Sequence, residues 1–115
     1  NESQVHENYK DMIIKARDID SRVTGRSTGH PVRALRNQMT KEYLKKEQEG
    51  APFEELELLT LGGLRRAVVD GDVKTGSVMA GQIAGMVKEK MSCHDLIQKL
   101  VKETDDLIGG KGFYE

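Results

Sequence analysis

The chain has 115 residues, enough for one domain, and its 18 basic side chains nearly balance its 19 acidic ones. Without a basic excess, and with three Tyr and two Phe as its only aromatic residues, it lacks the charged stripe and the stacking platform of a nucleic-acid-binding surface. Hydrophobic residues make up 37% of the chain and charged residues 32%, which leaves modest material for a core of its own.

Cysteine usage and hydropathy favour a cytoplasmic protein. Cys93 is the single cysteine, so the sequence has no internal disulfide and suits a reducing compartment. The charge-free run 75–87 is too short and too rich in glycine to span a bilayer, and no signal-peptide pattern is present, so no membrane contact is expected. Because the sequence begins at Asn1 rather than at a methionine, we expect an upstream portion.

Hydrophobic spacing predicts helices in the first half of the chain. Residues 8–17 should form a short helix. Residues 23–29 are rich in glycine and in β-branched or hydroxyl side chains, which indicates a loop with one short strand. Pro31 fits the first position of a second helix that runs to about Glu49. Its inward residues recur at helical spacing: Val32, Leu35, Met39 and Tyr43.

Further helices are expected after a break at residues 50–52. Pro52 can begin a third helix, which ends at Gly62 and Gly63, and a brief helix over residues 64–69 follows. Ser92 with Asp95 then resembles a capping box ahead of a strongly amphipathic last helix. The inward residues expected are Phe53, Leu56, Leu59 and Leu61 in the third helix, and Cys93, Leu96, Ile97, Leu100, Val101, Leu107 and Ile108 in the last one.

The most informative stretch is residues 71–85. As a helix from about Ser77, it would place five small residues on one face, so a flat partner should pack close to its backbone. Each interior glycine costs a helix about 1 kcal/mol relative to alanine, so two of them need compensation. The flat partner can be a second helix, a strand or the ring of a bound cofactor. The five small residues are Ser77, Ala80, Gly81, Ala84 and Gly85.

The polar residues of this stretch have two possible roles each, one structural and one in ligand binding. Gln82 would lie between Val78 and Met86 on an apolar arc, where an unpartnered amide costs about 1–3 kcal/mol. It would therefore either bond a neighbouring backbone or line a pocket. Thr75 and Ser77, at the entrance of the helix, would either cap it or hold a phosphate, carboxylate or carbonyl oxygen.

No complete catalytic or metal-binding set is visible in the sequence. His6, His30 and His94 are far apart, and none has a second ligand at metal spacing, so no metal site is predicted. The glycine spacing around residues 71–77 matches neither a P-loop nor a Rossmann turn. Cys93 belongs to the apolar stripe of the last helix, which should raise the pKa of its thiol and make it unreactive.

His30 is the one histidine in an informative setting. It lies in a glycine-flanked loop ahead of Arg33 and Arg36. These groups could meet an anion, or the two arginines could pair with carboxylates such as Asp18 or Asp20.

Four segments carry a resemblance to a known enzyme family. They are residues 15–20 (KARDID), 29–37 (GHPVRALRN), 64–72 (LRRAVVDGD) and 76–85 (GSVMAGQIAG). In this order they closely resemble the carboxy-terminal third of flavin-type enoyl-acyl-carrier-protein reductase II, within the wider nitronate monooxygenase family. The resemblance covers most of the chain, although the glycine-rich connection before residue 64 is slightly shorter than the family's.

The resemblance implies a chain that is mainly α: the helical subdomain and carboxy-terminal part of an FMN-binding (β/α)8 barrel enzyme. Residues 1–75 would form a helical subdomain that follows the barrel, held to it by Arg33 and Asn37. Residues 76–108, the small-faced helix and the carboxy-terminal helix, would pack back on the barrel, and residues 109–115 would be a flexible tail.

The activity implied is reduction of a 2-enoyl thioester by NAD(P)H through FMN, in fatty acid biosynthesis. The substrate would be linked to acyl carrier protein. This chain would be inactive without the missing amino-terminal barrel portion, and the resemblance leaves a homodimer open.

The resemblance also places the cofactor site on this chain. Met79 and Gln82 are the side chains expected beside the flavin and the substrate channel, together with Gly81, and the backbone of Ser77 or Ala80 would touch the ligand. No catalytic residue is expected here, because the family's active-site histidine and its main phosphate-binding glycines belong to the upstream barrel.

Two other functions remain open from the sequence. The first is a nitronate monooxygenase with the same fold, which would oxidise nitroalkanes through the same flavin. The second is a non-catalytic helical interaction module, in which Ala80, Gly81, Ala84 and Gly85 would receive a partner helix at close range.

Overall fold

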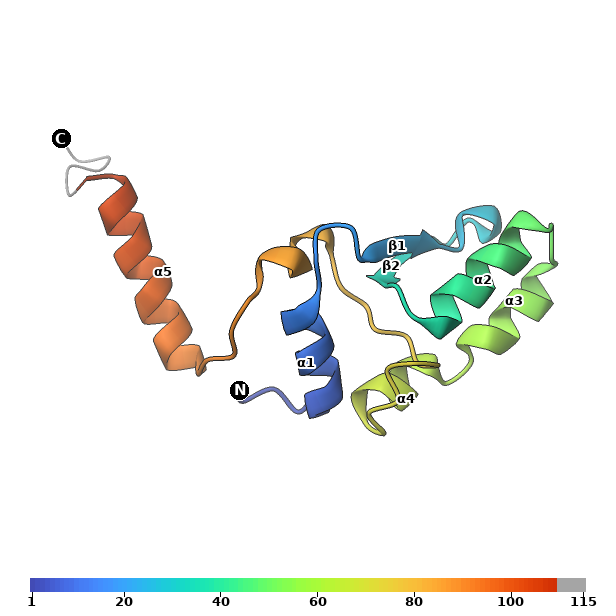
Figure 1. Ribbon diagram of the computed structural model, residues 1–115, viewed down its shortest axis with the longest axis horizontal. Coiled ribbons are helices and arrows are strands. Elements are labelled where there is room, and N and C mark those ends of the chain that lie inside the picture. Colours follow the sequence, from blue (N-terminus) through green and yellow to red (C-terminus); the bar gives the residue numbers. More distant parts are fainter. Residues whose placement is uncertain (110–115) are drawn as a thin grey trace.

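The structure is a computed structural model that describes residues 1–109, and it consists mainly of helices around one short antiparallel hairpin (Figure 1). The mainly α character expected from the sequence is confirmed. Residues 110–115, which form most of the expected tail, lie outside the described residues. None of the described helices is long and apolar enough to cross a bilayer. The elements in chain order are α1 (Glu7–Lys15), β1 (Ser21–Thr24), a 3₁₀ turn (Arg26–Thr28), β2 (Val32–Leu35), α2 (Gln38–Gln48), α3 (Phe53–Thr60), α4 (Gly63–Val68), a second 3₁₀ turn (Gln82–Met86) and α5 (Cys93–Leu107).

The hairpin of β1 and β2 takes the place of the first turns of the helix predicted to begin at Pro31, and the remainder of that helix is confirmed as α2. The strands are antiparallel, with Ser21 opposite Leu35. Gly25 and Gly29 flank the connecting 3₁₀ turn with φ angles of 83° and 78°, left-handed values that glycine adopts without strain. The chain therefore reverses and pairs with itself, and the helical spacing of the apolar residues in this region gave a wrong prediction.

Asn37 determines where α2 begins. Its Oδ1 accepts a hydrogen bond from Thr40 N at 2.9 Å, and Asn37 N donates to Thr40 Oγ1 at 2.8 Å, which completes a reciprocal capping box. The Asn37 Nδ2 also donates to the carbonyl oxygens of Val73 and Gly76, both at 2.8 Å. Both donors of the amide are thus used within the chain.

Residues 76–85 do not form the predicted small-faced helix. Their first half is extended and runs beside β2, where Leu35 N donates to Val78 O at 2.8 Å and Ala34 forms an antiparallel bridge with Met79. Their second half forms only the second 3₁₀ turn. Because glycine weakens a helix and the edge of β2 offers free backbone groups, strand pairing prevails over helical periodicity here.

Two small clusters of buried apolar side chains hold the body together. The first joins α1, β2, α4 and the extended segment, and the second lies between α2 and α3. In α3 the inward direction of Leu56 is confirmed, whereas Phe53 and Leu61 are 50% and 66% exposed, contrary to expectation. The cluster members are Tyr9, Ala16, Leu35, Ala67, Val78 and Ala84 in the first, and Met39, Tyr43 and Leu56 in the second.

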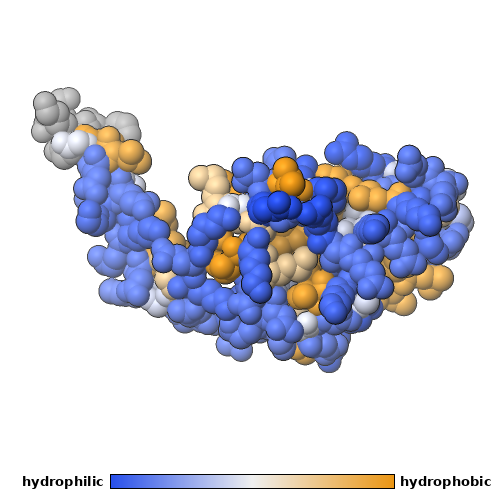
Figure 2. Space-filling view, in the orientation of Figure 1, coloured by the Kyte–Doolittle hydropathy of each residue, from blue (hydrophilic) through white to orange (hydrophobic). Residues whose placement is uncertain are grey.

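Helix α5 projects away from this body and has no buried residue (Figure 1). Ser92 caps it as predicted, since Asp95 N donates to Ser92 Oγ at 3.1 Å. Its apolar stripe is uncovered, with Leu100 54% exposed, and Figure 2 shows apolar surface in the notch between α5 and the body. The radius of gyration is 17.9 Å. A compact domain of similar length has about 13 Å, so this shape leaves apolar surface without a partner.

A methyl group should destabilise the fold at Gly76 but not at Gly81. A Cβ at Gly76 would overlap Asp72 O and lie 2.8 Å from Ala67 N, both backbone atoms, whereas at Gly81 it would meet nothing within 4 Å. We expect Gly76→Ala to lower the free energy of unfolding by about 1–3 kcal/mol. Gly81→Ala, the matched control, should leave it unchanged or raise it slightly. Urea unfolding followed by circular dichroism measures both, and equal effects would contradict the packing.

Replacing Asn37 by Asp should separate its two roles. The carboxylate keeps the acceptor for Thr40 N but loses both donors to Val73 O and Gly76 O. We expect Asn37→Asp to lower the free energy of unfolding by about 1–3 kcal/mol, because buried carbonyl oxygens lose their partners. If the variant unfolds at the same urea concentration as the unmodified chain, capping alone explains the role of this residue.

Candidate functional site

The residues expected at the cofactor site lie together, on the extended segment beside β2 and on the turn that follows it. Ser77 is buried at 8% exposure, Ala80 is half-buried, and Met79 is 43% exposed. Gly81 and Gln82 are exposed. Met79, Gly81 and Gln82 therefore lie at the surface of this segment, whereas Ser77 is buried.

Tyr9 fixes the position of Met79. The Tyr9 side chain on α1 is only 8% exposed, and its hydroxyl donates to Met79 O at 2.6 Å. Burial raises the pKa of the Tyr9 phenol above its ordinary value of 10.0, so the hydroxyl keeps its proton and stays a donor. Together with the bridge to Ala34, this bond holds the Met79 backbone from two sides.

The backbone amides of Ser77 and Ala80 are already engaged. Ser77 N donates to Gly63 O at 2.9 Å, and Ala80 N donates to Arg33 O at 3.4 Å. A Cβ on Gly63 would lie 2.5 Å from Ser77 Oγ, so this close approach to α4 needs a glycine. Neither amide is therefore free to donate to a ligand.

A pocket of about 370 Å³ lies beside Met79, between the hairpin and helices α2, α3 and α4. Met79 and Ser77 form part of one wall, and His30 lies on another. The lining includes one carboxylate side chain, Glu57, and one imidazole, His30, and no lysine or arginine of residues 1–109 belongs to it. The apolar lining consists mainly of Val32, Ala34, Met39, Tyr43, Phe53 and Leu64.

The small residues of this region serve different purposes. At Gly85 a Cβ would lie 2.6 Å from Asp18 Oδ1 and 2.8 Å from Asp18 N, so the glycine lets the chain pack on the turn after α1. Gly81 faces open space. The prediction that Gly81 and Gly85 lie on one helical face of small residues is therefore wrong. Gln82 is exposed, so water can solvate its amide and no apolar arc surrounds it.

The helix entrance at which Thr75 and Ser77 would either cap a helix or hold an anion is absent, since residues 77–81 form no helix. The amides there bind Asp72 instead: Lys74 N and Thr75 N donate to Asp72 Oδ1 at 3.1 and 3.0 Å, and Thr75 Oγ1 donates to Asp72 Oδ2. The hydroxyl of Thr75 holds the pKa of the Asp72 carboxyl below its usual range. A carboxylate of the chain thus occupies the place proposed for an outside anion.

Arg33 and Arg36 take structural roles. Arg36 Nε lies 3.0 Å from Asp20 Oδ1, and Arg33 Nη1 donates to Ser21 Oγ at 2.8 Å. The pairing of Arg36 with Asp20 is the alternative foreseen from the sequence. His30 is exposed and lines the pocket rather than joining the arginines in an anion cluster.

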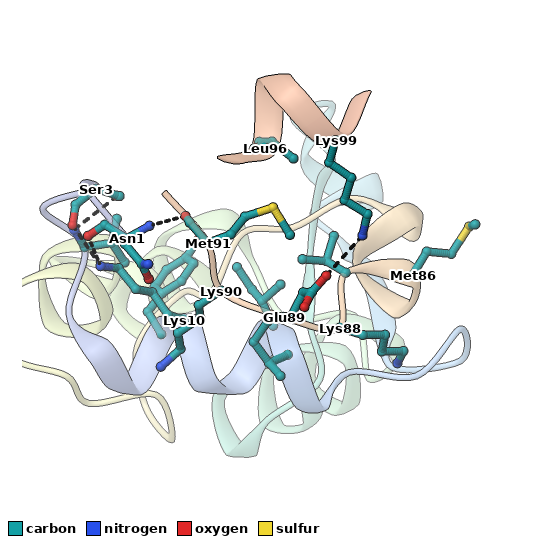
Figure 3. A pocket seen from close by; sticks show the side chains of 15 residues that line it. Asn1, Ser3, Lys10, Met86, Lys88, Glu89, Lys90, Met91, Leu96 and Lys99 are labelled. Carbon is teal, nitrogen blue, oxygen red and sulfur yellow. Dashed lines mark hydrogen bonds and ion pairs between the residues drawn. The ribbon is translucent and has the colours of Figure 1, made fainter. Parts of the chain in front are cut away.

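A second hollow, of about 500 Å³, lies between α1, the segment before α5 and α5 itself (Figure 3). None of the expected cofactor-binding residues lines it. Of its basic side chains, Lys10 pairs with Glu7, Lys90 pairs with Glu7 and Asp11, and Lys99 pairs with Glu89, whereas Lys88 donates to Ala16 O at 2.9 Å. The hollow therefore offers apolar surface under α5 rather than an anion site.

The titratable groups of residues 1–109 do not assemble a metal centre or an activated nucleophile. No group of three or more His, Cys, Asp or Glu side chains in this range could hold a metal ion. A hydrogen bond with Glu2 raises the pKa of the Cys93 thiol, which disfavours the nucleophilic thiolate. A raised pKa of the Cys93 thiol was expected from the sequence. Its cause is the Glu2 carboxylate and not apolar surroundings, since Cys93 is exposed.

Sequence reasoning missed one residue that positions this region, Tyr9, and it named Asn37 without foreseeing its bonds within the chain. Tyr9 shares one face of α1 with Ile13 and Ala16, so its burial could have been inferred from helical spacing. The hydrogen bond from its hydroxyl to the carbonyl oxygen of Met79, 70 residues away, could not have been inferred from the sequence. Asn37 ahead of Thr40 is a recognisable cap, but its clamp on the loop before Ser77 depends on the tertiary fold.

Comparison with known proteins identifies the family. The family model described as nitronate monooxygenase matches residues 1–103, and the chain therefore belongs to the nitronate monooxygenase family. A comparison with curated proteins gives no match.

Among solved structures, the chain is similar to FabK from Thermotoga maritima, with a TM-score of 0.85 and 37% sequence identity over 96% of this chain and 35% of that chain. It is also similar to a methionine-to-alanine mutant of the same FabK, with a TM-score of 0.76 and 34% identity over 98% of this chain and 33% of that one. The resemblance inferred from the sequence motifs is confirmed. The chain spans about one third of the length of these proteins.

Tyr9→Phe should weaken the structure at neutral pH and matter less in alkali. Removing the hydroxyl leaves Met79 O without its donor, which should lower the free energy of unfolding by about 0.5–1.5 kcal/mol. Because the folded pKa of Tyr9 exceeds the ordinary 10.0, the stabilisation is complete below pH 10.0 and declines as pH rises through the folded pKa. Urea unfolding at neutral pH and above pH 10.0 tests this. A stability difference that does not shrink in alkali would contradict the assignment.

Proposed function

We propose that this chain is the carboxy-terminal part of an FMN-dependent enoyl thioester reductase, which reduces 2-enoyl groups carried by acyl carrier protein with NADH or NADPH in fatty acid biosynthesis. The observation that carries the proposal is the similarity to FabK, at a TM-score of 0.85 and 37% identity over 96% of this chain. Because these residues span 35% of the FabK chain, activity would need the remaining portion as well.

The uncovered face of α5 supports a missing structural partner. Leu96, Ile97, Leu100 and Val101 are between 44% and 59% exposed on one amphipathic helix. Burying one such side chain stabilises a protein by about 1.5–3 kcal/mol, so a helix that exposes four of them lacks the surface it was selected to pack against. A barrel whose outer helices present apolar side chains would provide that surface.

The surface at Met79, Gly81 and Gln82 fits a flat ligand. Gly81 has no atom within 4 Å of the place where a side chain would begin, and the Met79 side chain is half-exposed beside it. An isoalloxazine or nicotinamide ring could thus approach the main chain at Gly81. When bound, FMN supplies the hydride transfer.

The residues of this chain would bind and orient in this reaction rather than transfer protons. The Met79 side chain would provide apolar contact, and the exposed Gln82 amide would provide hydrogen bonds. Ser77 and Ala80 would act indirectly, because their amides hold the segment to α4 and β2.

A nitronate monooxygenase is the second candidate, and the family assignment favours it. Both reactions would use the same flavin, so the two candidates differ in the substrate that is accepted. The test below includes both substrates for this reason.

The full-length protein should purify with bound FMN and reduce a 2-enoyl thioester with NADH or NADPH. We expect Met79→Ala to lower kcat/KM at least tenfold, which corresponds to about 1.4 kcal/mol of transition-state binding. Val69→Ala, at a residue that is 55% exposed and lines neither hollow, is the matched control and should leave kcat/KM unchanged.

Separate activity assays, one with an enoyl thioester and one with a nitroalkane, distinguish the reductase from the monooxygenase. Oxidation of the nitroalkane alone would replace the reductase by the monooxygenase. A full-length protein that binds no flavin would overturn both and favour the non-catalytic interaction module. Equal kinetics of Met79→Ala and Val69→Ala would remove Met79 from the site.

A further inference from the structure

The pocket beside Met79 is formed by segments that are distant in sequence. β2 contributes Ala34, α2 contributes Met39 and Tyr43, and α4 contributes Leu64. Its volume of about 370 Å³ lies within the range of about 300–1,000 Å³ that is typical of small-molecule sites. Neither the family assignment nor the similarity to FabK assigns a ligand to this pocket.

The chemistry of the lining restricts what the pocket can hold. No lysine or arginine in the described part of the chain lines it, so a phosphate or a nucleotide would find no charge-assisted partner among residues 1–109. Two of the lining hydroxyls already donate within the chain, Thr28 Oγ1 to Gly25 O at 2.8 Å and Thr60 Oγ1 to Glu57 O at 3.2 Å. The lining therefore suits a neutral and apolar guest.

Three large apolar side chains on the lining are only partly covered by the chain itself. Phe53 is 50% exposed, Leu64 is 47% exposed and Met79 is 43% exposed. They come from α3, α4 and the extended segment, and all three line the same pocket. A guest that lies among them would remove apolar surface from water on three sides at once, which is the main driving force for binding a hydrocarbon chain.

We propose that this pocket receives the acyl chain of the 2-enoyl thioester substrate. The proposal rests on the proposed function and adds the place where the length of the chain is recognised. Met79 belongs both to the surface assigned to the flavin and to the pocket wall, so the reacting end of the substrate lies at Met79 and the tail extends toward Leu64 and Phe53.

The first test compares chain-length dependence in the full-length protein. Each methylene buried contributes about 0.8 kcal/mol, or roughly a fourfold change in kcat/KM, so kcat/KM should rise from 2-butenoyl to 2-decenoyl pantetheine. Leu64→Trp fills the pocket and should flatten this rise, so that kcat/KM no longer increases with chain length. Leu58→Trp, on α3 at a residue that is 72% exposed and outside the lining, is the matched control and should keep the rise.

The second test needs no enzymatic activity. S-octanoyl-pantetheine is added to full-length protein with ¹³C-labelled methionine methyl groups, and the methyl signals of Met39 and Met79 should shift while those of Met12, Met86 and Met91 on this chain stay in place. Leu64→Trp should abolish the shifts, and Leu58→Trp should retain them.

The outcomes distinguish this proposal from the proposed function. If the protein reduces no enoyl thioester but the Met39 and Met79 signals shift, the reductase assignment fails and the acyl pocket stands. If the protein is a reductase but both tryptophan variants keep the same chain-length profile and the methyl signals do not move, the acyl chain lies elsewhere and this inference is overturned.

Discussion

The hydrogen bonds between residues 78–80 and the edge of β2 are the constraint on which the rest of this structure depends. Leu35 N donates to Val78 O, and Ala34 forms an isolated bridge with Met79, so a segment in the second half of the chain is joined to the hairpin formed in its first half. This pairing buries Val78 in the same cluster as Tyr9 and closes one wall of the pocket. Val78 thus shares one core with residues of α1, β2 and α4.

Helices with a strong amphipathic pattern or a clear terminal signal were predictable from the sequence. This holds for α1, α3, α4 and α5, whose limits follow capping residues or glycines. The structure of residues 31–37 was not predictable in this way, because the spacing of Val32 and Leu35 fits a helix as well as a strand. The deciding factors were two glycines with left-handed φ angles and a pairing segment over 40 residues away. Tertiary pairing overrides local periodicity in such short apolar runs.

The candidate site shows the same division between local and tertiary information. The structure places Met79, Gly81 and Gln82 of the motif over residues 76–85 at one exposed surface, and their contact with a cofactor stays a prediction that rests on resemblance. The physical reason given for the small residues was wrong, since Gly76 and Gly85 make room for backbone of this same chain. The pocket itself was out of reach of the sequence, because its walls come from elements whose contacts depend on the unforeseen hairpin.

The clamp made by the Asn37 side chain couples two parts of the pocket mechanically. The Asn37 side chain bonds both to the first turn of α2, which carries Met39 of the pocket lining, and to the loop that leads into Ser77, another lining residue. If the pocket holds the proposed acyl chain, α2 could move outward for a bulkier chain only by breaking these bonds or by displacing the segment that carries Met79. Evolution of a wider tolerance for guests would have to begin with the side chains of α3 and α4, which are free of this tether, and leave Asn37 in place.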